Sequence, residues 1–206
     1  MKHTVTKKSV NETKNSLIRS VPHETQFVLH GLWPQPRNNI YCHVDKELID
    51  ADKNRRWRDL PCLALDAEVE TALKKVMPGF ASDLHKHEWV KHGTCYGTQP
   101  SDYYRDAIQL TQQVNNSALG RLFSQNIGKM MTLKEVRRVA DKTWGKGRGK
   151  SIELRCKKGL ITELWLHLGG SEIRGNTNTL SSLLRQGKRI KSRCKQGRID
   201  RAGFGR

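Results

Sequence analysis

The segment from residue 87 to residue 92 carries four ionisable side chains, those of His87, Glu88, Lys91 and His92. In an α-helix successive side chains are about 100° apart, so these four fall within one arc of roughly 140° and the two apolar residues between them point the other way. Gly93 is a residue at which such a helix can end. Histidine serves as acid or base near neutral pH because its unperturbed pKa is about 6.5, and lysine supplies positive charge. This set has the groups needed for acid–base chemistry on a negatively charged substrate.

Three interpretations of this segment compete. The first is the solvated polar face of an amphipathic helix, for which two histidines, a glutamate and a lysine so close together are unusual. The second is a zinc site, but the His-Glu-x-x-His pattern needs histidines four residues apart, and His87 and His92 are five apart. Lys91 adds a cation between them, although His85 with His87 could still chelate a metal. The third, which we favour, is metal-free phosphoryl transfer, which needs a base, an acid and positive charge around a developing dianion.

A further histidine that could face this cluster is His30. It ends a short apolar run, residues 26–30, which predicts a buried strand. A lone histidine in that position is more often a structural residue. The residues that follow, Gly31-Leu32-Trp33-Pro34, provide a backbone turn beside an aromatic ring on which a nucleobase can stack. We therefore interpret His30 as the partner of the helical cluster.

The remaining patterns predict the elements that must position these groups. Helices are expected at residues 66–77, from residue 101 onward and at residues 132–145; strands are expected at residues 26–30, 151–156 and 160–168. Asp66 is expected to cap the first helix, and Thr132 with Glu135 forms a capping box for the third. The mixed order of elements indicates an α+β fold with helices packed against a mostly antiparallel sheet. Residues 1–25 are predicted to be a loosely ordered N-terminal arm, and residues 26–206 a single domain with a basic C-terminal segment.

Charge is abundant and unevenly distributed along the chain. The 206 residues include 38 Lys and Arg against 20 Asp and Glu, a formal net charge of +18. Gly145 to Arg206 holds 16 of the basic and 4 of the acidic residues, a net +12, which leaves +6 for residues 1–144. This excess favours a polyanionic partner such as nucleic acid, although a basic segment can also be only a solvated tail. No apolar run approaches the ~20 residues of a membrane-spanning helix, which excludes that class.

Two stretches together resemble a known family. Residues 30–34 and residues 87–95 resemble, in full and in order, the two active-site signatures of the ribonuclease T2 family, and in particular its bacterial ribonuclease I branch. The resemblance extends through Thr143-Trp144-Gly145-Lys146 and the paired strands around Cys156, and it covers roughly residues 27–194. It implies an α+β fold with an antiparallel sheet.

The resemblance also implies a role for each ionisable residue. His30 would be the general base that takes the proton from the ribose 2′-hydroxyl, and His92 the general acid that protonates the leaving 5′-oxygen. Glu88 and Lys91 would stabilise the pentacovalent phosphate, and His87 would hold the phosphate in place. No metal and no cofactor is implied.

Base binding is implied at three further positions: Trp33 would stack on a base, and Gln35 and Tyr41 would help to form its pocket. The expected activity is endonucleolytic cleavage of single-stranded RNA, with low sequence specificity, through a 2′,3′-cyclic phosphate. The expected protein is a monomer that acts away from membranes. The alternative from another class is a basic RNA-binding or toxin-like module of the same fold without turnover, because the strand with which the family normally begins is not recognisable in residues 1–26.

The five cysteines are Cys42, Cys62, Cys95, Cys156 and Cys194, and no two form a C-x-x-C pair, which argues against structural zinc. The resemblance implies disulfides from Cys62 to Cys95 and from Cys156 to Cys194, with Cys42 left over. It also implies a periplasmic or secreted protein, since disulfides persist in oxidising compartments. Residues 1–21 lack the apolar core of a secretory signal, so none is expected in this sequence.

Overall fold

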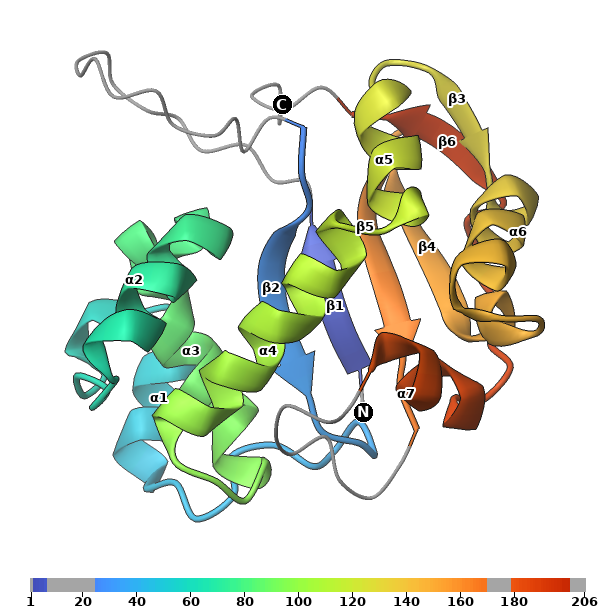
Figure 1. Cartoon of the computed structure of the whole chain (residues 1–206). Helices are drawn as coiled ribbons and strands as arrows, with labels where there is room; N and C mark the ends of the chain where they lie inside the picture. Colours follow the sequence, from blue (N-terminus) through green and yellow to red (C-terminus); the bar gives the residue numbers. More distant parts are fainter. Residues whose placement is uncertain (1, 7–24, 170–178, 201–206) are drawn as a thin grey trace.

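The computed structural model describes residues 25–169 and 179–200 in full, and residues 2–6 by their backbone. Helices cover one face of a twisted sheet, and a group of shorter helices stands beside one edge of that sheet (Figure 1). No helix within these residues is both long and apolar enough to cross a membrane. The architecture is α+β, as the sequence predicts.

Within the described residues the sheet has six strands: β1 (Lys2–Thr6), β2 (Val28–Trp33), β3 (Met130–Thr132), β4 (Ile152–Lys157), β5 (Leu160–His167) and β6 (Gln196–Ile199). Their order is β2-β1-β5-β6-β3. The remaining strand, β4, lies off this path and pairs with β5. All pairs are antiparallel except β5 with β6, which is parallel. The sheet is therefore mostly antiparallel, as the sequence predicts, with one parallel pair.

The helices are α1 (Lys46–Lys53), α2 (Ala67–Val76), α3 (Leu84–Lys91), α4 (Pro100–Asn115), α5 (Ala118–Gln125), α6 (Leu133–Trp144) and α7 (Leu180–Gln186). Single 3₁₀ turns connect several of them, at Trp57–Asp59, Pro78–Ser82, Gly93–Cys95 and Arg148–Ser151. The capping box of α6 is present, with Thr132 and Glu135 each bonded to the other's backbone. Asp66 precedes α2 but does not cap it, because its carboxylate pairs with Arg105 at 2.6 Å.

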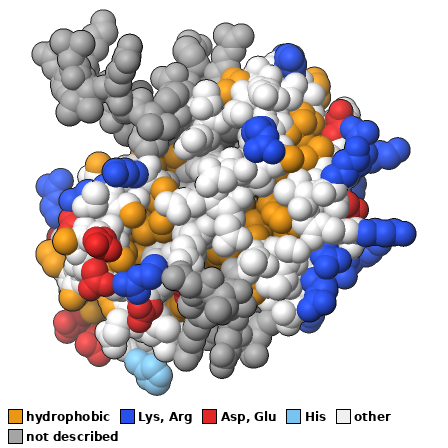
Figure 2. Space-filling view, viewed as in Figure 1, with side chains coloured by type: hydrophobic (Ala, Val, Ile, Leu, Met, Phe, Trp, Pro, Cys, Tyr) orange, Lys and Arg blue, Asp and Glu red, His pale blue; other side chains and the backbone are white. Residues whose placement is uncertain are grey.

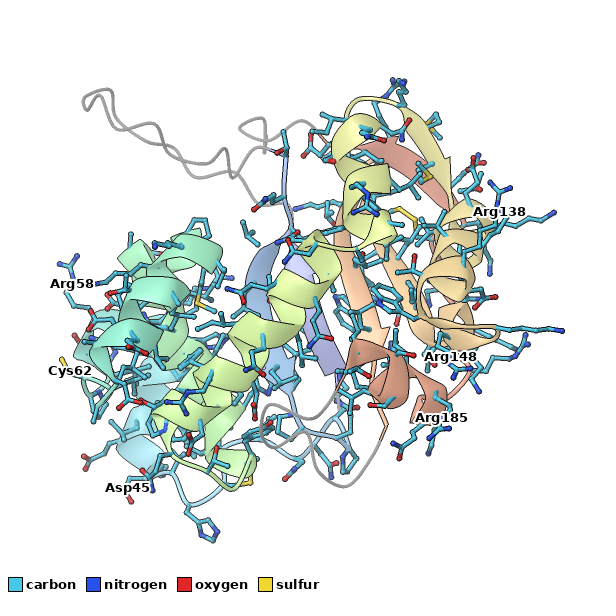
Figure 3. All side chains as sticks on the ribbon, in the orientation of Figure 1. Asp45, Arg58, Cys62, Arg138, Arg148 and Arg185 are labelled. Atoms are coloured by element: carbon cyan, nitrogen blue, oxygen red, sulfur yellow. A yellow bond between two sulfur atoms is a disulfide. The ribbon has the colours of Figure 1, made fainter. Side chains whose placement is uncertain are left out.

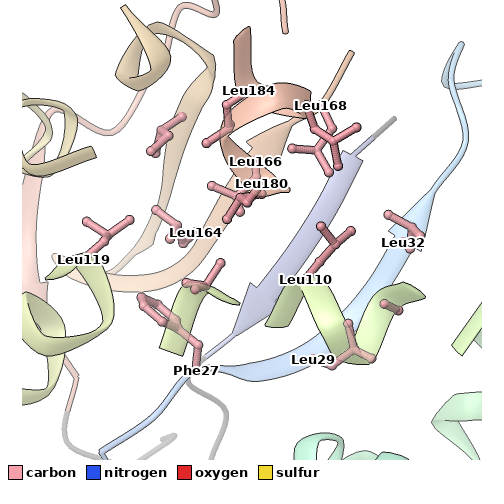
Figure 4. Close-up of a cluster of buried hydrophobic side chains, with 14 of the residues drawn as sticks. Phe27, Leu29, Leu32, Leu110, Leu119, Leu164, Leu166, Leu168, Leu180 and Leu184 are labelled. Atoms are coloured by element: carbon pink, nitrogen blue, oxygen red, sulfur yellow. The ribbon is translucent and has the colours of Figure 1, made fainter. Parts of the chain in front are cut away.

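The main core lies between the sheet and α4 to α7. Leu164 and Leu166 of β5 point into it and are fully buried, as are Leu29 and Leu32 of β2 at 2 % exposure or less (Figure 4). Side chains alternate along a strand, so Glu163, Trp165 and His167 lie on the opposite face and stay partly exposed. The ionisable side chains of β5 therefore lie on the face opposite the core.

The N-terminal residues contradict the prediction of a loosely ordered arm at one place. Lys2–Thr6 forms β1, which inserts between β2 and β5 and pairs antiparallel with both. The sheet therefore has an inner strand within residues 1–26, where the sequence analysis recognises none. The remainder of the predicted arm, residues 7–24, lies outside the described residues.

Basic side chains gather on one side of the molecule. Figure 2 shows Lys and Arg along the edge formed by α6 and α7, whereas the side of α1 and α2 mixes acidic and basic groups. Arg138, Arg148 and Arg185 project outward from that basic edge (Figure 3). The uneven charge of the sequence therefore becomes an uneven surface charge.

Candidate active site

The two signature segments meet in space, although Pro34 and His87, their nearest residues, are 53 positions apart in the sequence. His30 lies on β2 and the helical cluster lies on α3, which packs against that strand. The Nε2 atom of His30 is 3.4 Å from the Oε1 atom of Glu88. The predicted juxtaposition of His30 with the α3 cluster is confirmed by this contact.

Glu88 is the most deeply placed of these groups, with 1 % of its side chain exposed. Its Oε2 atom accepts a hydrogen bond from the indole nitrogen of Trp33 at 2.7 Å. Any side chain at position 31 would overlap that carboxylate, since a Cβ atom built on Gly31 collides with it. The glycine of the first signature thus makes room for the glutamate of the second.

His87 is held by a residue that the sequence analysis did not find. Its Nδ1 atom lies 2.5 Å from the Oδ1 atom of Asp52 on α1, and its ring stacks on Trp57 with centroids 4.6 Å apart. Asp52 is buried and also accepts a hydrogen bond from Tyr41 at 2.7 Å. The carboxylate fixes Nδ1 as the donor and leaves Nε2 toward the site, 3.9 Å from Glu88. No motif points to Asp52, because it lies 35 residues from its partner.

His92 follows the last residue of α3 and caps its C-terminus. Burial, together with the charges of Lys91, His87 and His30, lowers the pKa of His92 to about 3. The imidazole is therefore neutral near pH 7 when no ligand is bound. Lys91 stands one residue earlier, half-buried in the last turn of α3, so a positive charge lies beside the ring.

His30 has an acidic neighbour on each side. Its Nε2 atom faces Glu88, and its Nδ1 atom faces the Oε1 atom of Glu163 on β5 at 3.9 Å. Both separations are long for hydrogen bonds, and no group within the described part of the chain hydrogen-bonds Nδ1. The imidazole of His30 therefore lies between two carboxylates without a short hydrogen bond to either of them.

Trp33 lies at the centre of an aromatic group. Its ring is 5.3 Å from His30, 5.3 Å from His92 and 5.2 Å from Trp165, measured between centroids. Its indole N–H is committed to Glu88. The structure therefore places Trp33 between the two histidines, and its role in base stacking stays a prediction.

Gln35 and Tyr41 lie in the loop after β2. The amide of Gln35 is exposed and donates to the backbone carbonyls of Trp33 and Pro34, at 3.3 Å each. The hydroxyl of Tyr41 donates to Asp52, and burial together with that carboxylate raises its pKa well above the usual 10. Tyr41 thus helps to position Asp52, the hydrogen-bond partner of His87. The contribution of Gln35 and of Tyr41 to a base pocket stays a prediction.

The cysteine pairing predicted for α3 is wrong. Cys95 bonds Cys42, with Cα atoms 5.0 Å apart, and Cys62 is a free, exposed thiol at the outer surface (Figure 3). The loop after β2 lies against the end of α3, where the backbone N–H of Tyr41 donates to the carbonyl of Lys91, and this brings Cys42 to Cys95. The predicted Cys156–Cys194 disulfide is confirmed.

The sequence is similar to that of known proteins of one family. The model of the Ribonuclease T2 family matches residues 4–182. Ribonuclease I of Escherichia coli is 27 % identical over 173 residues, which cover 71 % of this chain and 62 % of that protein. Ribonuclease T2 of Aspergillus oryzae is 22 % identical, over 78 % of this chain and 63 % of its own length. The chain thus spans somewhat under two thirds of the length of these relatives.

A solved structure shows the same fold. The crystal structure of actibind, described as a T2 ribonuclease, superimposes with a TM-score of 0.60 at 16 % identity, and the match covers 99 % of this chain and 87 % of actibind. The family match extends over most of the sequence and includes both segments that build the site. This chain belongs to the Ribonuclease T2 family.

Proposed function

We propose that this chain is an endoribonuclease that cleaves single-stranded RNA by metal-free acid–base transphosphorylation. The observation that carries the proposal is the arrangement of His30 and His92 on separate elements, with both rings against Trp33 and His30 beside the buried carboxylate of Glu88. Two imidazoles in one site supply the base and the acid that the reaction needs. Membership of the Ribonuclease T2 family supports RNA as the substrate.

The first step makes the cyclic phosphate. His30 takes the proton of the 2′-hydroxyl, the freed oxygen attacks the adjacent phosphorus, and the bond from phosphorus to the 5′-oxygen breaks as His92 protonates that oxygen. The products are a 2′,3′-cyclic phosphate and a 5′-hydroxyl, and the proton balance is closed between the two histidines. Lys91 places positive charge against the developing dianion, and His87 holds the phosphate. The carboxylate of Glu88 lies 3.4 Å from His30 and 3.9 Å from His87, next to the proton that His30 takes up during the step.

The lowered pKa of His92 has a consequence for the order of events. A general acid must carry a proton, and a pKa of about 3 leaves His92 without one near neutrality. A bound phosphate brings negative charge next to the ring and opposes the effect of Lys91, so the pKa of His92 rises in the complex. We therefore infer that RNA binding and proton uptake by His92 are linked.

Several wider features belong to the same proposal. We propose a monomeric protein in which residues 26–206 form one domain completed by β1, acting in an oxidising compartment such as the periplasm or the cell exterior. The two disulfides support that compartment. The alternative of a binding module without turnover rested on an absent first strand, and β1 removes that reason.

The deciding experiment measures RNA cleavage in excess EDTA and identifies the products. An active enzyme that releases 2′,3′-cyclic ends, and that fails at a bond whose 5′-side sugar is 2′-deoxy, is expected. Inhibition by EDTA would favour a metallohydrolase, and RNA binding without cleavage would favour the module without turnover. Cleavage at the deoxy position would exclude the 2′-hydroxyl as nucleophile.

A further inference from the structure

A second group of side chains continues from the site along the face of the sheet opposite the core. Glu163 and Trp165 of β5 lie opposite Arg155 and Glu153 of β4 in an antiparallel pair, so all four side chains share one face. His167 is the next residue of β5 on the same face. The alternate residues of both strands are buried in the core. We call these five residues the sheet platform; none of them belongs to the two signature segments.

The platform is connected directly to the site. The Trp165 ring stands perpendicular to that of Trp33, with centroids 5.2 Å apart. Its indole N–H donates to Glu163 at 2.6 Å, and the other oxygen of that carboxylate faces His30. The platform therefore begins at the general base and extends away from it.

Its outer part has the chemistry of a nucleobase site. The guanidinium of Arg155 lies over the Trp165 ring at 4.5 Å, and 46 % of the Arg155 side chain is exposed. Trp165 is itself partly exposed. Unstacked bases bind proteins by stacking on aromatic rings and on arginine planes, and this layer offers both.

The carboxylate beneath this layer is already compensated. Glu153 pairs with Arg155 at 3.1 Å and with His167 at 2.9 Å, and it is nearly buried. Its negative charge is therefore taken up by protein groups rather than presented to a phosphate. These bonds also hold Arg155 over the ring, so the stacking surface is formed before a ligand arrives.

The two nitrogens of His30 define the direction of an RNA chain across the platform. Its Nε2 atom faces Glu88 at the centre of the site, and its Nδ1 atom faces Glu163. As the base, His30 must touch the ribose on the 5′ side of the scissile phosphate, whereas His92 touches the leaving group on the 3′ side. The platform beyond His30 therefore lies toward the 5′ end of the substrate.

We propose that Trp165 and Arg155 bind the nucleobase one position upstream of the nucleotide whose 2′-hydroxyl attacks. This inference rests on the proposed function, since it takes its direction from the roles of His30 and His92. It makes the minimal efficient substrate a trinucleotide rather than a dinucleotide. Base stacking in such sites tolerates every base, so the site adds affinity without sequence preference.

The test compares two substrates of wild-type protein: a dinucleotide, and a trinucleotide whose first sugar is 2′-deoxy so that only the second bond can be cut. The kcat/KM value of the trinucleotide should exceed that of the dinucleotide about 5- to 150-fold. This is the factor that corresponds to the stacking free energy of one base. In Trp165→Ala and in Arg155→Gln the ratio should fall toward one, whatever each does to the dinucleotide. Arg121→Gln, which changes an exposed arginine on α5, is the matched control and should keep the wild-type ratio.

An abasic first nucleotide gives an answer that does not depend on any variant folding. It should abolish the trinucleotide advantage; if the advantage survives, the contact is to phosphate or sugar and the inference of a base site is wrong. A wild-type ratio of one in an enzyme that cuts the dinucleotide overturns the platform and leaves the proposed function standing. Failure to cut either substrate contradicts the proposed function itself.

Discussion

Two regions of the site hold their histidines in opposite ways. In the corner between α1 and α3, His87 is bonded to Asp52 at 2.5 Å and stacked on Trp57. In the seam between β2 and the end of α3, His30 and His92 each have a ring Nδ1 that no group of the described residues hydrogen-bonds. We refer to these regions as the corner and the seam. In the corner, the hydrogen bond to Asp52 fixes the orientation of the histidine ring. In the seam, no hydrogen bond to Nδ1 from the described residues fixes the orientation of either ring.

The difference matches the tasks that we propose for the two regions. A group that holds a phosphate gains from a fixed orientation and a stabilised positive charge, since the organisation is complete before binding. A group that must gain and lose a proton in each turnover gains from having no hydrogen bond that holds its ring in one tautomer. We therefore propose that the corner serves phosphate binding and the seam serves proton transfer.

The largest effect is expected in the seam. His92→Ala should lower turnover by roughly 10²–10⁴ on RNA, the range for loss of a general acid. The loss should be much smaller on a substrate whose leaving group needs no proton, such as a nitrophenyl ester of a nucleoside 3′-phosphate. Steady-state kinetics on both substrates measure this. An equal loss on both would mean that His92 binds the phosphate rather than donating a proton.

The second prediction concerns the link between the seam and the loop that carries Tyr41. Cys42→Ser should lower the free energy of unfolding by about 2–4 kcal/mol, because it opens a disulfide that closes a long loop. Cys62→Ser is the matched control and should stay within about 0.5 kcal/mol, since that thiol is exposed and unbonded. Denaturant titration measures both. A large loss at Cys62 instead would restore the pairing that the family resemblance implies.

A smaller effect is expected in the corner. Asp52→Asn replaces the carboxylate that holds the His87 ring in position, so KM for RNA and the inhibition constant of inorganic phosphate should rise about 10- to 10²-fold, the range expected for loss of one hydrogen bond to a charged group. Asp50→Asn on the same helix is exposed and should change neither. If kcat falls while phosphate affinity is unchanged, the corner takes part in proton transfer and the division fails.

The sequence predicts the residues that carry the chemistry of this site better than it predicts the residues that hold them in position. His30, Glu88, Lys91 and His92 were found because local spacing and two short signatures place them, and β2 and α3 bring them together as expected. Asp52 was missed because a buried carboxylate that bonds one side chain 35 residues away leaves no periodic signal. Support residues of this kind are determined by tertiary packing alone.

The same limit explains why the predicted N-terminal arm and the predicted Cys62–Cys95 disulfide differ from the structure. Lys2–Thr6 has a polar sequence without a clear strand pattern, yet it becomes an inner strand because β2 and β5, far away along the chain, supply partners on both edges. The pairing of Cys95 depends on which loop rests against the end of α3, and it is the loop after β2 rather than the one before α2. Both outcomes depend on contacts between distant segments, which composition and spacing do not encode.

The smallest effect is expected outside both regions, on the basic side of the molecule. Lys188, Arg189 and Lys191 are exposed in the segment after α7 and belong to the C-terminal part that carries a net +12. A phosphate neutralised on a single strand contributes about 0.7 to the slope of log affinity against log salt, so changing all three residues to glutamine should flatten that slope by up to about 2. The change should appear in KM and its salt dependence rather than in kcat, because these side chains lie on neither the corner nor the seam. The matched control removes three exposed cations elsewhere, at Lys46, Lys75 and Arg121. A slope that moves equally in both variants would indicate net charge alone, and a slope that does not move would make the segment a solvated surface without a role in RNA binding.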